Sequence, residues 1–238
     1  MPPDVSPSPQ DSHPVGSTEI RVWDLPIRIF HWSLVALVAT SIISGKIGGD
    51  AMDVHLKAGN AIIILLVFRL IWGIVGTTNA RFMSFIHRIS TVLAYCRDMF
   101  RGKAYSPHGH NPLGGWMVVI MLALLAIQAG TGLFASDDID CEGPLASRYG
   151  KDISDILTAF HKLNFKVLAM FIGLHVAAIG FYLVVKRINL IRPMISGRSQ
   201  GAPEHALAAV RVPVRTNVLA IALLVSVAAG FYWLVPYA

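Results

Sequence analysis

Four histidines lie at or inside apolar stretches of the chain, where an ionisable side chain is costly and therefore a candidate for function. They are His31, His55, His161 and His175. His161 and His175 are 14 residues apart, which is close to four turns at about 3.6 residues per turn, so one helix face would carry both. At about 1.5 Å per residue their separation along the helix would be about 21 Å. One helix would therefore offer ligands at two depths.

Each of these two histidines needs a partner at its own depth. We predict that His55 pairs with His161 near the outer side of the membrane and that His31 pairs with His175 nearer the inner side. Neutral imidazole is an iron ligand, and two axial imidazoles fill both axial positions of a haem. A haem held in this way has no open position for oxygen and suits electron transfer.

Other interpretations of the histidines remain open from the sequence. A single histidine at the end of a membrane helix is more often an interfacial or hydrogen-bonded residue than a ligand. A zinc site would gather three or four ligands in one place, whereas these histidines are expected to form two separated pairs. Cys96 and Cys141 belong to no CxxC or CxxCH motif, which excludes covalent c-type haem attachment.

The elements that would position these histidines are membrane helices. Hydrophobic residues make up 54% of the 238 residues, and charged residues make up 14%, below the roughly 25% of a soluble domain. Five apolar stretches approach the ~20 residues that span a hydrocarbon core. They predict transmembrane helices at residues 25–47, 54–76, 114–135, 160–185 and 218–235. No strand pattern is visible, so the predicted fold is an all-α membrane bundle with a four-helix di-haem core and a peripheral fifth helix.

Charge in the loops predicts the orientation of the bundle. Positive residues gather in the loops after the second and fourth helices, and the loop after the third helix is acidic. The positive-inside rule then places the N-terminus in the cytoplasm and the C-terminus on the opposite side of the membrane, which for a bacterial inner membrane is the periplasm. It also explains the net charge of +6, so no nucleic-acid partner is predicted.

The chain is expected to divide into three parts. Residues 1–20 are rich in proline and serine and predict a disordered tail, residues 21–198 form the di-haem domain, and residues 199–238 form a linker and the last helix. Asp24 is the expected N-cap of the first helix. Residues 82–100 are either an amphipathic helix on the membrane surface or an ordinary connecting helix.

Several segments resemble the bacterial di-haem cytochrome b-561 family, which includes the cytochrome b subunits of membrane-bound nickel–iron hydrogenases. They are WDLPIRIFHW, VHLKAGNAIIILLVFRLIWGIVG, GHNPLGGWM, QAGTGL and FHKLNFKVLAMFIGLHVAAIGFY, and the resemblance runs over residues 21–198. It implies two non-covalent haems b, ligated by residues that match His31, His55, His161 and His175. It also implies electron transfer in a respiratory chain, between the quinone pool and a periplasmic c-type cytochrome or hydrogenase.

Hydrogenase subunits of this family tend to carry a doubled histidine near the start of the fourth helix, whereas this chain has His161 alone. The difference favours family members that work beside a c-type cytochrome. Two functions from other classes also remain open. One is a quinone-linked or superoxide-oxidising haem enzyme, and the other is a haem-free membrane anchor subunit.

Two further residues are candidates for the haem propionates. Arg69 lies 14 residues after His55, on the same helix face and at the expected level of the inner haem. Arginine binds carboxylates through two parallel hydrogen bonds, although a pair with a backbone carbonyl is the alternative. His110 precedes the third helix and would contact a propionate or a quinone head group, or else cap the helix. Glycines in the third and fourth helices, Gly132 among them, would let a flat macrocycle or a neighbouring helix approach.

Overall fold

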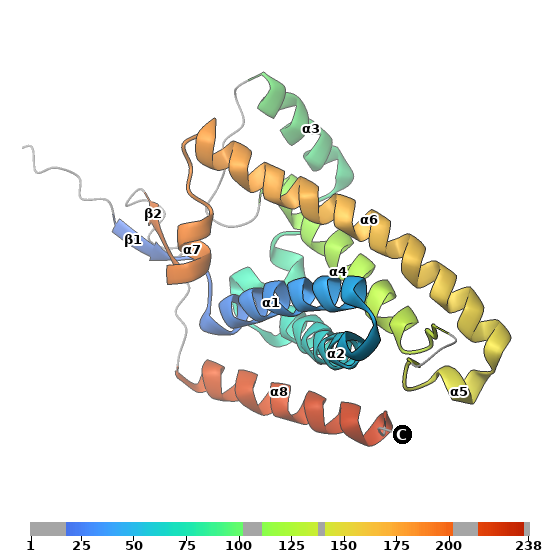
Figure 1. Cartoon of the computed structure of the whole chain (residues 1–238). Helices are drawn as coiled ribbons and strands as arrows, with labels where there is room; N and C mark the ends of the chain where they lie inside the picture. Colours follow the sequence, from blue (N-terminus) through green and yellow to red (C-terminus); the bar gives the residue numbers. More distant parts are fainter. Residues whose placement is uncertain (1–17, 102–110, 138–140, 202–213, 236–238) are drawn as a thin grey trace, which may run out of the picture.

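Five long helices dominate the computed structural model, which describes residues 18–101, 111–137, 141–201 and 214–235. Each is long and apolar enough to cross a membrane. They are α1 (Leu25–Ile47), α2 (Met52–Val75), α4 (Pro112–Gly132), α6 (Lys151–Val184) and α8 (Val214–Leu234) (Figure 1). The predicted all-α membrane bundle is confirmed.

The first helix begins and ends where its sequence predicts. The Asp24 carboxylate accepts a hydrogen bond from the Ile27 backbone N–H at 2.8 Å, and Pro26 occupies the first turn. At the other end Gly48 has a φ of 72°, a left-handed value that glycine adopts without strain and that lets the chain turn toward α2. Asp24 is therefore confirmed as the N-cap.

The other helices differ from their predicted bounds, most of all α6. It begins at Lys151, nine residues before the predicted start at residue 160. Its first turns mix charged and apolar residues, so hydropathy does not mark them as part of a membrane helix. The Ser154 hydroxyl donates to the Phe134 carbonyl at 2.8 Å, which fastens this extension to the end of α4. α4 itself starts earlier than predicted because Asn111 caps it, accepting from the Gly114 N–H at 2.6 Å.

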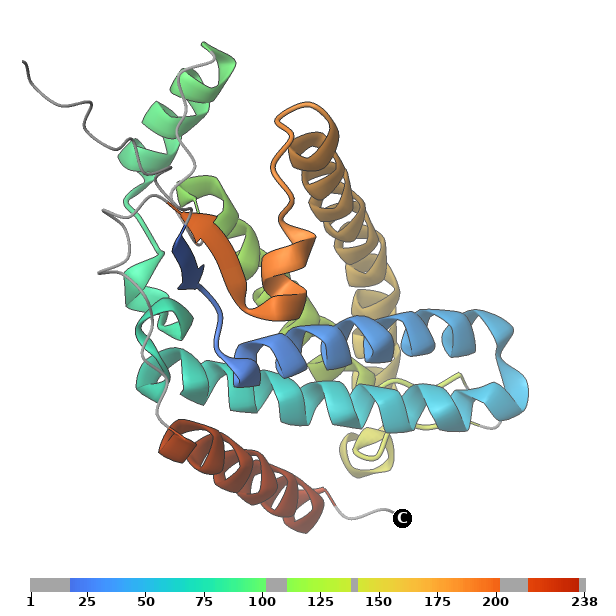
Figure 2. The same ribbon diagram turned by 90° about the vertical axis from the view of Figure 1, so that its left-hand side faces the viewer.

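The long helices pack as a chain of neighbours. α1 lies against α2, α2 against α4, and α4 against α6, while α8 lies along α2 (Figures 1 and 2). Ile62 and Leu66 of α2 meet Leu125 of α4 and Leu168 of α6 in one buried cluster. Ala220 of α8 joins a second cluster around Trp72, so α8 packs on the outside of the other four helices.

A small sheet lies near the start of α1, at the end of the bundle that the loop charges predict to be inner. A two-stranded antiparallel sheet pairs β1 (Thr18–Arg21) with β2 (Arg198–Gly201). This corrects two expectations, that no strand is present and that the disordered tail extends to residue 20; residues 1–17 of that tail lie outside the described part. The strands were missed because each is only four residues long and depends on a partner far away in the sequence.

The remaining elements are three 3-10 turns and three short helices. Residues 82–100 form a 3-10 turn, η3 (Phe82–Ser84), and a separate helix, α3 (Ile89–Phe100), so the predicted segment is broken at residues 85–88. Two further 3-10 turns, η1 (Gly49–Ala51) and η2 (Thr78–Ala80), follow α1 and α2. α5 (Ala146–Tyr149) precedes α6, and α7 (Ile191–Ser196) follows it.

Candidate functional site

His55 and His161 face each other toward the N-terminal ends of α2 and α6, at the end of the bundle that is predicted to be outer. Their ring centroids are 6.1 Å apart, with the ring planes at 78°. Two imidazole nitrogens at about 2 Å from one metal ion would be about 4 Å apart, and their ring centres about 6 Å apart. The two rings therefore stand at a separation that would allow both of them to ligate one metal ion.

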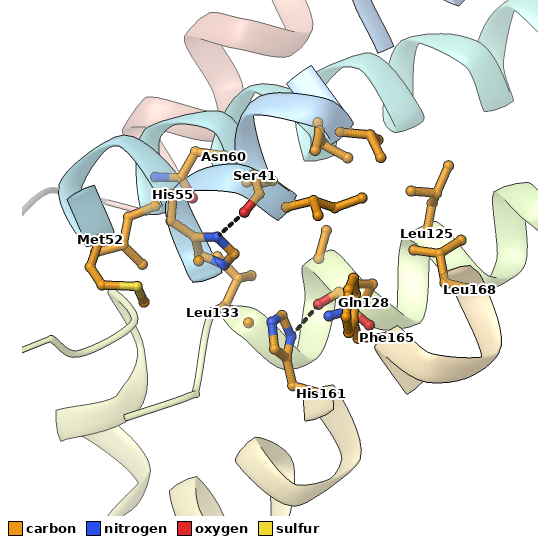
Figure 3. Close-up of a pocket in the computed structure, with 18 of the residues that line it drawn as sticks. Ser41, Met52, His55, Asn60, Leu125, Gln128, Leu133, His161, Phe165 and Leu168 are labelled. Carbon is orange, nitrogen blue, oxygen red and sulfur yellow. Dashed lines mark hydrogen bonds between the residues drawn. The ribbon is translucent and has the colours of Figure 1, made fainter. Parts of the chain in front are cut away.

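Hydrogen bonds set the orientation of both rings. The Nδ1 of His55 is 2.8 Å from the Ser41 carbonyl oxygen, and the Nδ1 of His161 is 2.8 Å from the Gln128 carbonyl oxygen (Figure 3). A carbonyl oxygen only accepts, so each Nδ1 carries the proton and donates it. The lone pair of each ring is then on Nε2, the form that ligates a metal ion.

A cavity of about 290 Å³ lies between the two rings and the helices that carry them. α1, α2, α4 and α6 all contribute to its wall, which is largely apolar and includes Leu125, Phe165 and Leu168 (Figure 3). Lys46 and Lys162 are the charged residues of this wall. An apolar slot with cationic side chains fits a group that is flat, apolar and anionic at one edge, as haem is.

The second predicted pair lies farther along the same helix. His31 of α1 and His175 of α6 are close enough for a coulombic interaction between their rings. The His31 ring also packs edge-on against Trp32, with centroids 5.2 Å apart. In contrast to the outer histidines, the Nδ1 of His31 is buried and has no hydrogen-bond partner among the described residues.

The described residues contain no group of three or more histidine, cysteine, aspartate or glutamate side chains that could hold a metal ion. Structural zinc sites need such a group, with four ligands arranged as a tetrahedron. Within this part of the chain, the donor set therefore suits a cofactor that needs only two protein ligands.

Arg69 lies on α2 in a buried polar network at the inner end of the bundle. It is 4% exposed, and its guanidinium lies 4.6 Å from the centre of the Phe82 ring. Asp24 is near enough to interact with this charge. The Asp24 carboxylate also accepts from Trp72 Nε1 at 3.2 Å and from Thr77 Oγ1 at 2.6 Å.

One terminal nitrogen of Arg69, Nη1, is buried and has no hydrogen-bond partner among the described residues. A buried donor without a partner is costly, so this nitrogen is available for an anionic group. The propionate role of Arg69 stays a prediction, and the sequence did not reveal its interaction with Asp24. His110, the other propionate or quinone candidate, lies outside the described residues.

The structure adds residues that the sequence analysis missed. Ser41 and Gln128 act through their backbone carbonyls, so their side-chain types carry no signal. Gly45 lies against the His55 ring, and Gly132 lies against the His161 ring. Only Gly132 belonged to the glycines that were expected to allow close approach.

Residues 22–197 match the family model described as prokaryotic cytochrome b561. The chain belongs to this family. It is also 28% identical over 216 residues to the "Probable Ni/Fe-hydrogenase B-type cytochrome subunit" of Azotobacter chroococcum mcd 1, covering 76% of this chain and 88% of that protein. The protein of the same description from Rhizobium leguminosarum bv. viciae is 26% identical over 215 residues, covering 75% and 87%. No solved structure matches the chain.

This membership makes the protein a membrane b-type cytochrome that functions in electron transfer. Its five apolar helices agree with a multi-pass protein of the inner membrane. The single histidine at residue 161 favoured a c-type cytochrome as partner in the sequence analysis. The curated relatives are instead described as hydrogenase subunits.

Proposed function

We propose that this cytochrome carries electrons across the inner membrane through two haems b, between a periplasmic redox protein and the quinone pool. The observation that carries the proposal is the His55–His161 pair, with its 6.1 Å separation and both Nε2 atoms left free by the Nδ1 hydrogen bonds. His31 of α1 and His175 of α6 would form the second ligand pair, and His175 lies 14 residues after His161 along α6.

The protein residues would bind, orient and insulate the haems. When bound, haem supplies a one-electron iron couple that the protein alone lacks. Paired histidines would fill both axial positions, which favours electron transfer over oxygen chemistry. The apolar wall around Leu125, Phe165 and Leu168 would keep water away from the outer haem. Arg69 would donate from its unpaired Nη1 to a propionate of the inner haem, with His110 as a second candidate.

The orientation follows from the charge of the loops. With the N-terminus in the cytoplasm, the His55–His161 pair faces the periplasm and the C-terminus is periplasmic. The relatives are described as hydrogenase subunits, so we propose a nickel–iron hydrogenase as the periplasmic partner. A c-type cytochrome is the competing partner. Hydrogen-dependent reduction of the b haem in native membranes would support the first, and reduction by a c-type cytochrome without a response to hydrogen would support the second.

Haem content tests the ligand assignment. The purified protein should give two haems per chain in a pyridine haemochrome assay and a b-type α band after reduction with dithionite. His161→Ala and His175→Ala should each lose one haem, because each removes an axial ligand from a different pair. His87→Ala is the matched control, since the His87 ring contacts the Phe85 carbonyl, at 2.8 Å, outside both pairs. Retention of two haems in either of the first two variants would contradict the proposal.

A further inference from the structure

The two outer histidines are held by the same local device on two different helices. Each ring lies against a glycine and donates to the carbonyl oxygen four residues before that glycine. On α1 the carbonyl and the glycine belong to Ser41 and Gly45, and on α4 they belong to Gln128 and Gly132. We call each carbonyl–glycine combination a glycine window.

Glycine is required because a helical side chain covers the turn that precedes it, where this carbonyl lies. A Cβ on Gly45 would be 2.8 Å from the His55 Nδ1, and a Cβ on Gly132 would be 3.1 Å from the His161 Cε1. A larger residue at position 45 would therefore force the His55 ring to shift, and one at position 132 would press on the His161 ring, which disturbs the hydrogen bond to the carbonyl in each case. The carbonyl has a second lone pair, so it accepts from the histidine without losing its helix hydrogen bond.

The inner pair has no such support in the described part of the chain. No other described glycine has a histidine ring among the nearest neighbours of its Cβ position. The Nδ1 of His31 is buried without a partner there. The two predicted haem sites therefore differ in the hydrogen bonding of their ligands, although both use two histidines.

We infer that the glycine windows make the outer haem the lower-potential haem of the two. This inference rests on the proposed function. An imidazole that donates its Nδ1–H becomes a more basic ligand through Nε2, and a more basic ligand stabilises ferric iron over ferrous iron. Both outer ligands gain this effect, whereas His31 gains none from the described residues. An electron on the outer haem would then move to the inner haem with a favourable free-energy change.

Nearby charges do not change which of the two haems is expected to have the lower reduction potential. Lys46 and Lys162 line the outer cavity and would favour reduction there, but both side chains are exposed and are screened by water and salt. Arg69 is buried at the inner end of α2, where a positive charge favours reduction of the inner haem. Asp24 offsets part of that charge.

Potentiometric titration of the b haems tests the inference on the full chain. Gly132→Ala and Gly45→Ala should each raise the lower of the two midpoint potentials and leave the higher one unchanged. The reason is that the displaced histidine ring loses its hydrogen bond to the backbone carbonyl. A tenfold change in the reduction equilibrium corresponds to about 59 mV for one electron. Gly130→Ala is the matched control on α4, since a Cβ there meets nothing within 4 Å.

His161→Ala provides a second, independent measurement. It should remove the outer haem and leave a single component at the upper midpoint. If Gly132→Ala or Gly45→Ala loses a haem instead of shifting it, the remaining component should also lie at the upper midpoint.

The inference is overturned if a glycine variant changes the upper midpoint potential or changes neither potential. It is also overturned if the haem that remains in a variant with one haem has the lower midpoint potential. None of these results contradicts the proposed function, because the wild-type protein would still hold two haems. A wild-type protein with fewer than two haems would instead contradict the proposed function, and the inference with it.

Discussion

At the scale of single residues, the choice between the two nitrogens of histidine decides what His55 and His161 can bind. The carbonyl oxygens of Ser41 and Gln128 hold the proton on Nδ1 in both rings. Nε2 is then the ring nitrogen that is left to ligate a metal ion in both side chains. Rings oriented in this way would bind the metal ion without having to turn.

Asp24 combines three tasks in one buried carboxylate. It is 2% exposed, caps α1, and accepts from Trp72 and Thr77 beside the buried Arg69. We predict that Asp24→Ala destabilises the protein by about 3–5 kcal/mol, because it removes the cap of α1, leaves the Trp72 and Thr77 donors without their acceptor and takes a negative charge away from the buried Arg69. Loss of folded protein on heating in detergent, measured by gel filtration, would check this.

Two other variants test whether the charge and the burial of the Asp24 carboxylate account for the loss of stability. Asp24→Asn keeps an oxygen that can cap α1, but it removes the charge and replaces the oxygen that accepts from Trp72 and Thr77 with an NH2 group. Its stability should therefore fall between those of the wild type and Asp24→Ala. Asp98→Ala removes a 44% exposed carboxylate that pairs with Arg97, and it should have little effect. Equal stability of Asp24→Ala and Asp98→Ala would refute the importance of the buried network.

At the scale of elements, α6 carries one member of each histidine pair and connects the two sides of the bundle. It packs against α4, while His161 faces His55 of α2 at the cavity and His175 lies near His31 of α1. This arrangement explains why a helix with two inward-facing histidines is only sparsely buried along its length. Beyond its charged first turns, much of its remaining surface is apolar and suited to lipid or to the cofactors.

The inner end of α6 is tied to α3 and α4 through hydroxyl and amide groups. Tyr182 Oη is 2.9 Å from Tyr95 Oη and accepts from Asn111 Nδ2 at 3.0 Å. We predict that Tyr182→Phe speeds hydrogen exchange of α3 amides by about tenfold, because hydrogen bonds worth about 1 kcal/mol each are lost. Tyr149→Phe is the control, since Tyr149 is exposed at the other end of α6. Unchanged exchange in Tyr182→Phe would contradict this link.

The same link should depend on alkaline pH. Burial, followed by the hydrogen bond with Tyr182, raises the pKa of the Tyr95 phenol above its ordinary value. A free tyrosine loses its proton near pH 10, so the detached state would ionise before the attached one. The stabilisation is therefore complete below about pH 10 and declines above it. The control variant Tyr149→Phe should keep this pH dependence, and Tyr182→Phe should weaken it.

At the scale of the whole molecule, the two cysteines provide a test of orientation. Cys141 lies in the loop between α4 and α5, at the end of the bundle that is predicted to be outer, and Cys96 lies on α3, at the end that is predicted to be inner. We predict that a membrane-impermeant maleimide labels Cys141 from the periplasm and reaches Cys96 only after permeabilisation. Labelling of Cys96 from the periplasm in the Cys141→Ser variant would contradict the predicted orientation and indicate the opposite one.

The rate of this labelling should rise with pH. Burial raises the pKa of the Cys141 thiol, and the nearby carboxylates of Asp137, Asp53 and Glu142 raise it further. The thiolate is the reactive form, so labelling at neutral pH should be slow and should accelerate in alkaline buffer. Fast labelling at neutral pH would show that the thiol is more open than its surroundings indicate.

Some features were predictable because they depend on residues close together in the sequence. A helix cap needs only residues a few positions apart, so Asp24 predicts the start of α1. Helix periodicity likewise places His161 and His175 on one face, and hydropathy finds the parts of helices that lie in lipid. The amphipathic first turns of α6 escaped prediction because hydropathy reports burial in lipid and not helix length.

The sequence by itself determined the membrane fold, the candidate histidines and their register along α6. Only the tertiary structure decided which groups support those histidines, namely the carbonyls of Ser41 and Gln128 behind Gly45 and Gly132. It also decided the pairing of β1 with β2 and the place of Asp24 beside Arg69. The physical reason is that backbone carbonyls are alike in every residue. Their role depends on which turn of a neighbouring helix lies beside them, and packing between distant segments determines that.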